Sequence, residues 1–272
     1  MSLAILHCRG QSGIDAPPVT IEVFLSGGLP AFTIVGMAET AVRESKDRVR
    51  GALISSGFDF PQQRITVSLG PADMPKAGGR YDLAIALGIL AARKQFSINV
   101  LAQFEFYGEL ALSGKLRSVP GILPAALSAR VSRRSIVVPI ENRSEATVTG
   151  ADVYPAGSLL EVTAHLTGRK TIQPYTESPG KCASPPQYDL ADVKGQSRAK
   201  RALEIAAAGG HNLLFIGPPG TGKSMLARRL PGLLPPLSKT EAIETAAINS
   251  VLGIPLAAAS WRRRPFRAPH HT

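Results

Sequence analysis

The sequence predicts an α/β protein in two parts that are joined by a linker. Between residues 19 and 166, short β-branched or aromatic runs alternate with helical patterns, as in an α/β domain. From residue 195 onward, a helical run, a short apolar run and a glycine-rich loop follow one another, which indicates the start of a second α/β domain. Residues 171–188 are rich in proline, serine and glycine and lack periodicity, so they are expected to form an exposed linker.

The strands of the first part are predicted from short runs rich in β-branched and aromatic residues. Gly27 and Gly28 separate the first two runs, which predicts a hairpin-like turn between them. The short, mostly apolar run at 135–139 predicts a buried strand. The expected strands are 19–25, 32–36, 64–70, 104–112, 135–139 and 152–156.

The helices of the first part are predicted from their periodicity. Residues 38–57 place Val42, Val49 and Leu53 on one stripe, and Gly57 follows as a stop signal. Residues 81–94 are mostly apolar, which predicts a buried helix. Two further helices are expected at 124–132 and 158–166.

The second part begins with strong helix formers at 195–210, which end in a double glycine. The apolar run 212–217 is expected to be a buried strand that leads into the glycine-rich loop. A helix is expected to begin within 222–230, and a further helix is expected over 238–250.

The composition favours a cytoplasmic protein without a membrane segment. No apolar run approaches the length of a membrane span, and the N-terminus lacks the pattern of a secretory signal. The two cysteines, Cys8 and Cys182, lie far apart and near no histidine pair. Buried or idle thiols in a reducing cytosol are therefore expected, rather than metal ligands or a disulfide.

The positive charge is concentrated in the second part. Residues 1–180 carry 18 Lys/Arg against 15 Asp/Glu, a net +3, and residues 181–272 carry 13 against 5, a net +8. This basic excess favours a polyanionic partner, either a nucleotide or a nucleic acid. A basic surface that is simply solvated is the alternative that composition leaves open.

Three short basic features have more than one interpretation. Arg262–Arg264 beside Trp261 suit a phosphate backbone with a stacking ring, and they suit a solvated loop nearly as well. Arg228–Arg229 are expected to face solvent or a neighbouring subunit. His270–His271 are interpreted as structural or close to DNA, because adjacent histidines do not easily share one metal ion.

The loop "GPPGTGKS" carries the clearest chemical signal. Its pattern G-x-x-x-x-G-K-S between a predicted strand and helix is typical of a phosphate-binding loop. The glycines permit close approach, so that backbone N–H groups point at the β-phosphate, aided by the positive end of the following helix. Lys223 is expected to reach the β- and γ-phosphates, and the Ser224 hydroxyl is expected to ligate Mg²⁺. The predicted nucleotide contacts are Gly217, Pro218, Pro219, Gly220, Thr221, Gly222, Lys223 and Ser224.

The segment "DLADVKGQSRAKRALEIAAAGGHNLLFIGPPGTGKSMLARRLPGLLPPL" resembles the nucleotide-binding start of AAA+ ATPases related to the magnesium chelatase ATPase subunit. The terminal "RRRPFRAPHHT" is similar to the same branch. Together with the first part, the whole chain resembles the bacterial YifB/ComM family. The resemblance implies ATP or ADP with Mg²⁺, a homo-hexamer and a DNA partner when full length. It also places Val193 and Gly195 by the adenine pocket.

The first part resembles the Lon-protease fold, an S5-like α/β domain. "YGELALSGKLRSVPGILPAALSARVSRRSIVVPIENRSEA" runs parallel to the Lon pattern around its catalytic lysine. Where the family has its serine, this sequence has Arg80, Tyr81 or Asp82, and where the family has its lysine, Leu123 stands. Because a hydroxyl is a poor nucleophile without a nearby base, a scaffold or DNA-contact module is expected rather than a protease. Lys76 and Ser68 are interpreted as surface and strand residues.

These likenesses imply three domain assignments. Residues 1–170 are expected to form a Lon-protease-like S5-fold domain that lacks the Ser–Lys dyad. Residues 171–188 form the linker, and 189–272 form the N-terminal part of a magnesium chelatase-like AAA+ domain.

The acid that a P-loop ATPase uses to activate water is missing from the predicted strands. After Ser224 the acids are Glu241 and Glu244, and both fall in the helix predicted at 238–250 rather than at the end of an apolar strand. No catalytic residue is therefore identified. The chain is expected to be the N-terminal portion of a longer protein, which binds ATP but does not hydrolyse it alone.

Four functions remain open at this point. The first is the ATP-binding portion of a YifB/ComM-type AAA+ ATPase, which in full length migrates DNA branches in natural transformation and recombination. The second is a magnesium chelatase ATPase subunit of tetrapyrrole synthesis. The third is an ATP-dependent Lon-like protease, against which the missing dyad argues. The fourth is a nucleic-acid-binding module without enzymatic activity.

Overall fold

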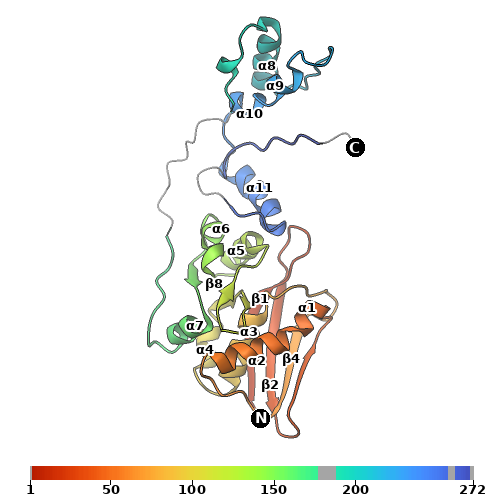
Figure 1. Ribbon diagram of the computed structural model, residues 1–272. Coiled ribbons are helices and arrows are strands. Elements are labelled where there is room, and N and C mark those ends of the chain that lie inside the picture. The colour runs from red at the N-terminus through yellow and green to blue at the C-terminus, as the bar shows by residue number, and fades with distance from the viewer. Residues whose placement is uncertain (1, 177–187, 257–260, 270–272) are drawn as a thin grey trace. The chain divides into compact units, whose positions relative to one another are not determined.

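The computed structural model of the protein describes residues 2–176, 188–256 and 261–269 (Figure 1). The chain divides into two compact units. Unit 1 comprises Met1–Ser178 with Thr245–Leu256, and unit 2 comprises Pro179–Glu244 with Ala257–Thr272. Most of the predicted linker, together with Cys182, His270 and His271, lies outside the described residues.

Unit 1 contains a seven-stranded sheet in the order β3-β4-β2-β1-β5-β8-β9. Strand β2 runs antiparallel to both of its neighbours, and the remaining pairs are parallel. The predicted α/β class is confirmed, and the central sheet is mostly parallel. The strands are β1 (Ser2–Arg9), β2 (Pro18–Ser26), β3 (Ala31–Val35), β4 (Arg64–Gly70), β5 (Phe104–Phe106), β8 (Ser135–Pro139) and β9 (Val153–Ala156), and a separate ribbon joins β6 (Glu109–Leu110) to β7 (Leu116–Arg117).

The hairpin predicted between 19–25 and 32–36 is wrong, because β4 lies between β2 and β3. Strand β1, for which the sequence analysis made no prediction, fills one edge of β2 along its whole length, and β4 fills the other. The chain therefore leaves β2 through its glycines and returns parallel to β4. The strand predicted at 104–112 is also interrupted, at Gly108, whose φ of 148° separates β5 from β6.

Helix α3 (Asp82–Ala92) is the centre of unit 1 and packs on β1 and β2. All its residues are buried, as its apolar sequence predicts. Helix α2 (Ser45–Ser55) packs on α3, and it buries Val49 and Leu53 on the predicted stripe. The other helical segments of unit 1 are α1 (Thr40–Arg43), α4 (Ile98–Leu101), α5 (Ile122–Val131), η1 (Ile140–Asn142), α6 (Arg143–Thr147) and α7 (Leu159–Leu166).

The start of the predicted linker is held against unit 1. The Tyr175 backbone N–H donates to the Val153 carbonyl of β9 at 2.8 Å, and the Arg143 guanidinium lies over the Tyr175 ring. The Ile172 N–H donates to His165 Nδ1 at 3.1 Å. Residues 171–176 therefore extend the edge of the folded unit.

Unit 2 is built from short helices around a small core of Leu190, Val193, Leu203 and Leu226. The strand predicted at 212–217 is wrong: these residues have no regular structure, and Ile216 is 88% exposed. A strand needs a hydrogen-bonding neighbour, and the described residues of unit 2 form no strand at all. The helices are η2 (Leu190–Asp192), α8 (Ser197–Gly209), α9 (Lys223–Ala227), α10 (Leu230–Leu233) and α11 (Lys239–Val251), of which α11 continues into unit 1.

Across the described ranges of the chain, none of the helices has the length and apolar character that a bilayer crossing requires.

Candidate nucleotide-binding site

The glycine-rich loop turns sharply before α9. Gly220 and Gly222 have φ values of 82° and 84°, in the left-handed region that favours glycine. A Cβ on Gly220 would meet no atom within 4 Å, so its need for glycine comes from the backbone torsion and not from crowding. The tight curvature predicted for the loop is thus present.

The Lys223 side chain folds back across this loop. Its Nζ donates to the carbonyl oxygens of Gly217 and Pro218, each at 2.7 Å, and lies 3.4 Å from Thr221 Oγ1. Thr221 Oγ1 itself donates to the Pro218 carbonyl at 2.9 Å. The ammonium is held against the loop by neutral acceptors, and a phosphate would be a stronger, charged acceptor for the same N–H groups.

Ser224 is exposed in the first turn of α9, where backbone N–H groups have no helical partner. A hydroxyl oxygen together with phosphate oxygens and waters suits Mg²⁺, which prefers oxygen ligands. The described residues contain no cluster of three histidine, cysteine, aspartate or glutamate side chains that could hold a metal without a nucleotide. The exposed Ser224 hydroxyl at the start of α9 is the group of this loop that fits Mg²⁺.

The segment at 192–196 is joined to the loop by a hydrogen bond. Gln196 Nε2 donates to the Thr221 carbonyl at 3.1 Å. Val193 is buried in the core of unit 2, and Gly195 has a φ of 69°. The backbone of this segment is consequently fixed next to the loop, where the family resemblance puts the adenine.

Arg229 corrects an expectation, because it is bound within unit 2 instead of facing solvent. Its Nε donates to the Asp189 carbonyl at 2.8 Å, and its guanidinium lies over the Tyr188 ring. Arg228 is exposed, as expected.

The arginines near the C-terminus also contact the chain itself. Arg262 Nε donates to the Leu237 carbonyl at 3.1 Å, and Arg264 Nε donates to the Pro235 carbonyl at 2.7 Å. These bonds hold Arg262 and Arg264 against the segment that precedes α11. The two arginines therefore have a structural contact that neither interpretation, a phosphate-binding site or a solvated loop, had included.

The acids that follow the loop lie on α11, as predicted. Glu241 Oε2 accepts from the Ser238 N–H at 2.8 Å, and the Glu241 N–H donates to Ser238 Oγ at 3.3 Å. This reciprocal pair is a helix capping box, and it engages the Glu241 carboxylate at the start of the helix.

Within unit 1, Arg80 is one of the three residues considered at the Lon serine position, and Leu123 stands at the Lon lysine position; Arg80 contacts the segment just before α5. The Arg80 guanidinium, 4% exposed, donates to backbone oxygens of Arg9, Gly10 and Pro120. Leu123 is fully buried in the first turn of α5, directly after Pro120 and Gly121. Neither side chain offers a nucleophile or a base, so no Ser–Lys chemistry is available there.

The start of α5 is covered by Ser250, a contact that the sequence did not predict. The Gly121 N–H donates to the Ser250 carbonyl at 2.8 Å, and the Leu123 N–H donates to Ser250 Oγ at 3.2 Å. Ser250 also bonds the Glu145 carboxylate, whose pKa is raised by burial. Polar atoms of the chain itself thus occupy the N–H groups at this helix end.

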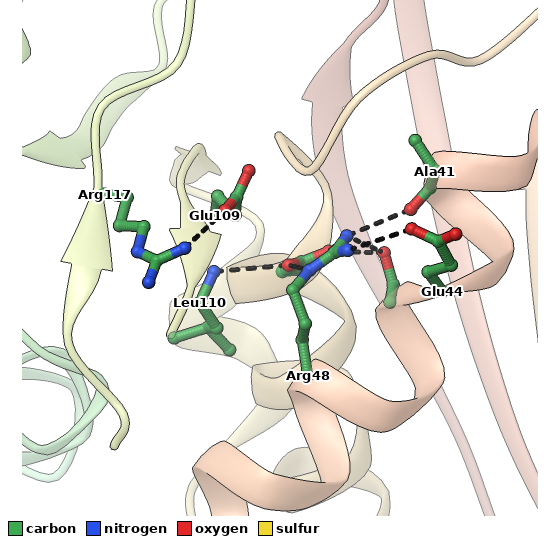
Figure 2. A network of polar contacts seen from close by, with 8 residues as sticks. Ala41, Glu44, Arg48, Glu109, Leu110 and Arg117 are labelled. Carbon is green, nitrogen blue, oxygen red and sulfur yellow. Dashed lines mark hydrogen bonds and ion pairs between the residues drawn. The ribbon is translucent and has the colours of Figure 1, made fainter. Parts of the chain in front are cut away.

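Asp82, the third residue considered at the serine position, is the centre of a buried polar network. Figure 2 shows this network with its partners Arg48 and Leu110 labelled. Its carboxylate accepts from Arg48 Nε at 2.6 Å, from the Leu110 N–H at 3.2 Å and from the Ser45 hydroxyl. Burial raises the pKa of Asp82, and the bonds from Arg48 and Ser45 oppose that shift. The network ties α2, α3 and β6 together.

The predictions for three other residues of unit 1 have different outcomes. Lys76 is buried rather than on the surface, its ammonium bonds the Pro71 carbonyl, and burial lowers its pKa. Ser68 lies on β4, as expected. Cys8 is buried as predicted, and burial raises its pKa to about 12, which keeps the thiol protonated.

Comparison with known proteins matches both parts of the chain to one family. Residues 21–142 match the model of "Subunit ChlI of Mg-chelatase", and residues 189–272 match that of "Magnesium chelatase, subunit ChlI". The whole chain is 52% identical to "Competence protein ComM" of Haemophilus influenzae and 50% identical to "Uncharacterized protein YifB" of Escherichia coli. The chain belongs to the YifB/ComM family.

A more distant member of the family is "Uncharacterized protein Rv2897c" of Mycobacterium tuberculosis, with 44% identity over 285 residues. In each of these three alignments the whole of this chain is covered, but only 54% of the relative. The chain therefore spans about half the length of the YifB/ComM relatives it matches.

Proposed function

We propose that this chain is the ATP-binding portion of a YifB/ComM-type AAA+ ATPase. The observation that carries the proposal is the loop at 217–224, with Gly220 and Gly222 in left-handed conformations and the Lys223 ammonium bonded to the loop's own carbonyl oxygens. Lys223 would hold the phosphates by charge-assisted hydrogen bonds, and the Ser224 hydroxyl would be a ligand of the Mg²⁺ that accompanies the nucleotide and neutralises its phosphate charge.

The remaining nucleotide contacts are divided between two segments. The backbone N–H groups of the loop surround the β-phosphate, and Val193 with Gly195 borders the adenine. Since Glu241 is engaged in its helix cap and Glu244 lies on the same helix, this chain holds ATP without activating water for its hydrolysis.

We further propose that the full-length protein is a cytoplasmic homo-hexamer that acts on DNA, as a branch-migration helicase in natural transformation and recombination. Two observations support this proposal: the Haemophilus influenzae relative is named as a competence protein, and residues 181–272 carry a net charge of +8. A magnesium chelatase ATPase subunit is the second candidate, because both family models carry that description. Arg80 and Leu123 argue against a Lon-like protease.

The test of the nucleotide site is calorimetry with Mg-ADP on the Lys223→Ala variant. Loss of a charge-assisted hydrogen bond, on the order of 1.5–3 kcal/mol, predicts an affinity about 10- to 100-fold weaker. Lys239→Ala removes the same charge from an exposed site at the start of α11 and is expected to bind like the parent. Equal affinity of the parent and Lys223→Ala would refute the proposed site.

A further inference from the structure

Three hollows adjoin one another at a single end of the sheet in unit 1. This is the end at which β1, β3 and β4 begin and at which β2 and α3 finish. Their volumes are about 540, 330 and 210 Å³. The Arg80 cluster lies at the other end, where β1 finishes and α3 begins, so the hollows are separate from the replaced dyad.

The hollows form one continuous run around the segment that leads into β4. The largest and the smallest share Arg50, Phe60 and Gln62, and the largest and the second share Arg93. Gln63 lines both the second and the smallest. A chain of open depressions suits an extended polymer better than a compact ligand, which prefers a single enclosed pocket.

The run is positively charged. Its lining includes Lys46, Arg50, Arg93 and Lys94 against two acids, a net +2. Residues 1–180 as a whole carry 18 Lys/Arg against 15 Asp/Glu, so cations outnumber acids more strongly in this lining than in this part of the chain overall. Such a surface suits a partner with a repeating negative charge.

Aromatic rings lie between these charges. Phe32, Phe58 and Phe60 are half-buried, with the Phe32 and Phe60 rings 6.1 Å apart, centroid to centroid. The Arg50 guanidinium lies over the Phe60 ring at 5.4 Å. The three rings also pack against the core of unit 1, and their exposed parts line the hollows beside the arginines. Aromatic rings together with arginines are the combination that binds unstacked bases and their phosphates.

We propose that this run of hollows binds single-stranded nucleic acid, with Arg50 and Arg93 on phosphates and Phe60 stacked on a base. An acidic peptide would satisfy the charges but would leave the rings unused. A duplex keeps its bases stacked inside and offers only its phosphates. The inference gives a surface to the DNA role proposed above, and it does not depend on the nucleotide loop.

The experiment measures fluorescence anisotropy of a labelled 20-mer of deoxythymidine, without nucleotide, across a salt series. For single strands each phosphate contact contributes about 0.7 to the salt slope, so the Arg50→Ala/Arg93→Ala variant is expected to lose about 1.4 of slope. Phe60→Leu is expected to weaken binding about tenfold at unchanged slope, since stacking is not ionic. Arg169→Ala, an exposed arginine that lines none of the hollows, is expected to match the parent.

Circular dichroism and Mg-ADP binding are measured on every variant. Normal Mg-ADP affinity in Arg50→Ala/Arg93→Ala and in Phe60→Leu, the two hollow variants, shows that unit 2 is intact. If the parent protein itself fails to bind Mg-ADP, that result refutes only the proposed nucleotide-binding function. Three results would overturn the surface assignment: unchanged DNA affinity in both hollow variants, tighter binding of the matching duplex, or equal competition by polyglutamate.

Discussion

At the scale of single residues, two carboxylates in the interior of unit 1 are each paired with an arginine. Arg9 and Glu105 pair at 2.9 Å with both side chains buried, and the Tyr107 hydroxyl donates to the same carboxylate at 2.6 Å. The buried Asp82 is paired with Arg48, whose side chain is partly exposed. Paired burial of this kind fixes geometry, and removal of one partner leaves the other charge without compensation.

Asp82→Asn is expected to lower the free energy of unfolding by about 1–3 kcal/mol at pH 7. Removing one member of a buried pair costs about 3–5 kcal/mol, and the partial exposure of Arg48 reduces that figure through solvent screening. Arg48 also lies 3.9 Å from the exposed Glu44 (Figure 2), so Glu44→Gln is the matched control and is expected to change stability by less than about 0.5 kcal/mol. Urea unfolding followed by circular dichroism measures both. Equal effects of the two variants would contradict the assigned role of Asp82.

At the scale of elements, helices were more predictable than strand pairing. The stripe on α2 and the apolar α3 were found because helical periodicity is local. The strands that pair with β2 could not be predicted in this way, because pairing depends on the whole sheet. Strands β1 and β4 occupy the two edges of β2, so β3 cannot pair with it. The strand expected at 212–217 failed for a related reason, since an apolar run becomes a strand only beside another strand.

Strand β3 offers a test of how its ends are fixed. Gly36 has a φ of 107°, and a Cβ there would overlap the Leu69 carbonyl oxygen of β4. Gly36→Ala is therefore expected to lower the free energy of unfolding by about 2–5 kcal/mol, from the strained torsion and the overlap together. Gly27→Ala, before the same strand, meets no atom within 4 Å and is expected to change stability by less than about 0.5 kcal/mol. Urea unfolding of the two glycine variants measures both effects. If Gly36→Ala destabilised the protein as little as Gly27→Ala does, the argument from the Gly36 torsion and its overlap with Leu69 would be contradicted.

At the scale of the whole molecule, the candidate site was more visible in the sequence than its surroundings. The loop at 217–224 was recognised because its spacing encodes a backbone shape, and Val193 with Gly195 came from the resemblance. The cover over α5 was not predicted, because Ser250 and Leu123 are 127 residues apart in the chain. The buried position of Lys76 was missed for the same reason: nothing local in the sequence indicates which loop will close over it.

Residues 1–176 are expected to fold as an independent, cooperative unit. Every buried residue of the large hydrophobic core lies between Ala4 and Leu166, and the contacts of Ile172 and Tyr175 extend the unit past residue 170. The fragment lacks Ser250, whose two hydrogen bonds to the start of α5 are worth about 0.5–1.5 kcal/mol each. Urea unfolding should therefore show a single transition, about 1–3 kcal/mol less stable than in the full chain.

Hydrogen exchange locates the difference between the fragment and the full chain. The amides of Gly121 and Leu123 are expected to exchange faster in the fragment, while those of the fully covered α3 stay protected. Ser250→Ala in the full chain is expected to release the Leu123 amide and to leave the Gly121 amide protected, because the carbonyl that Gly121 uses is retained.

The fragment of residues 1–176 is expected to leave casein intact, since Arg80 and Leu123 replace the dyad. Hydrolysis that survives purification and disappears on changing a single residue of this unit would overturn that expectation, and a non-cooperative transition would show that unit 1 needs residues 245–256 to fold.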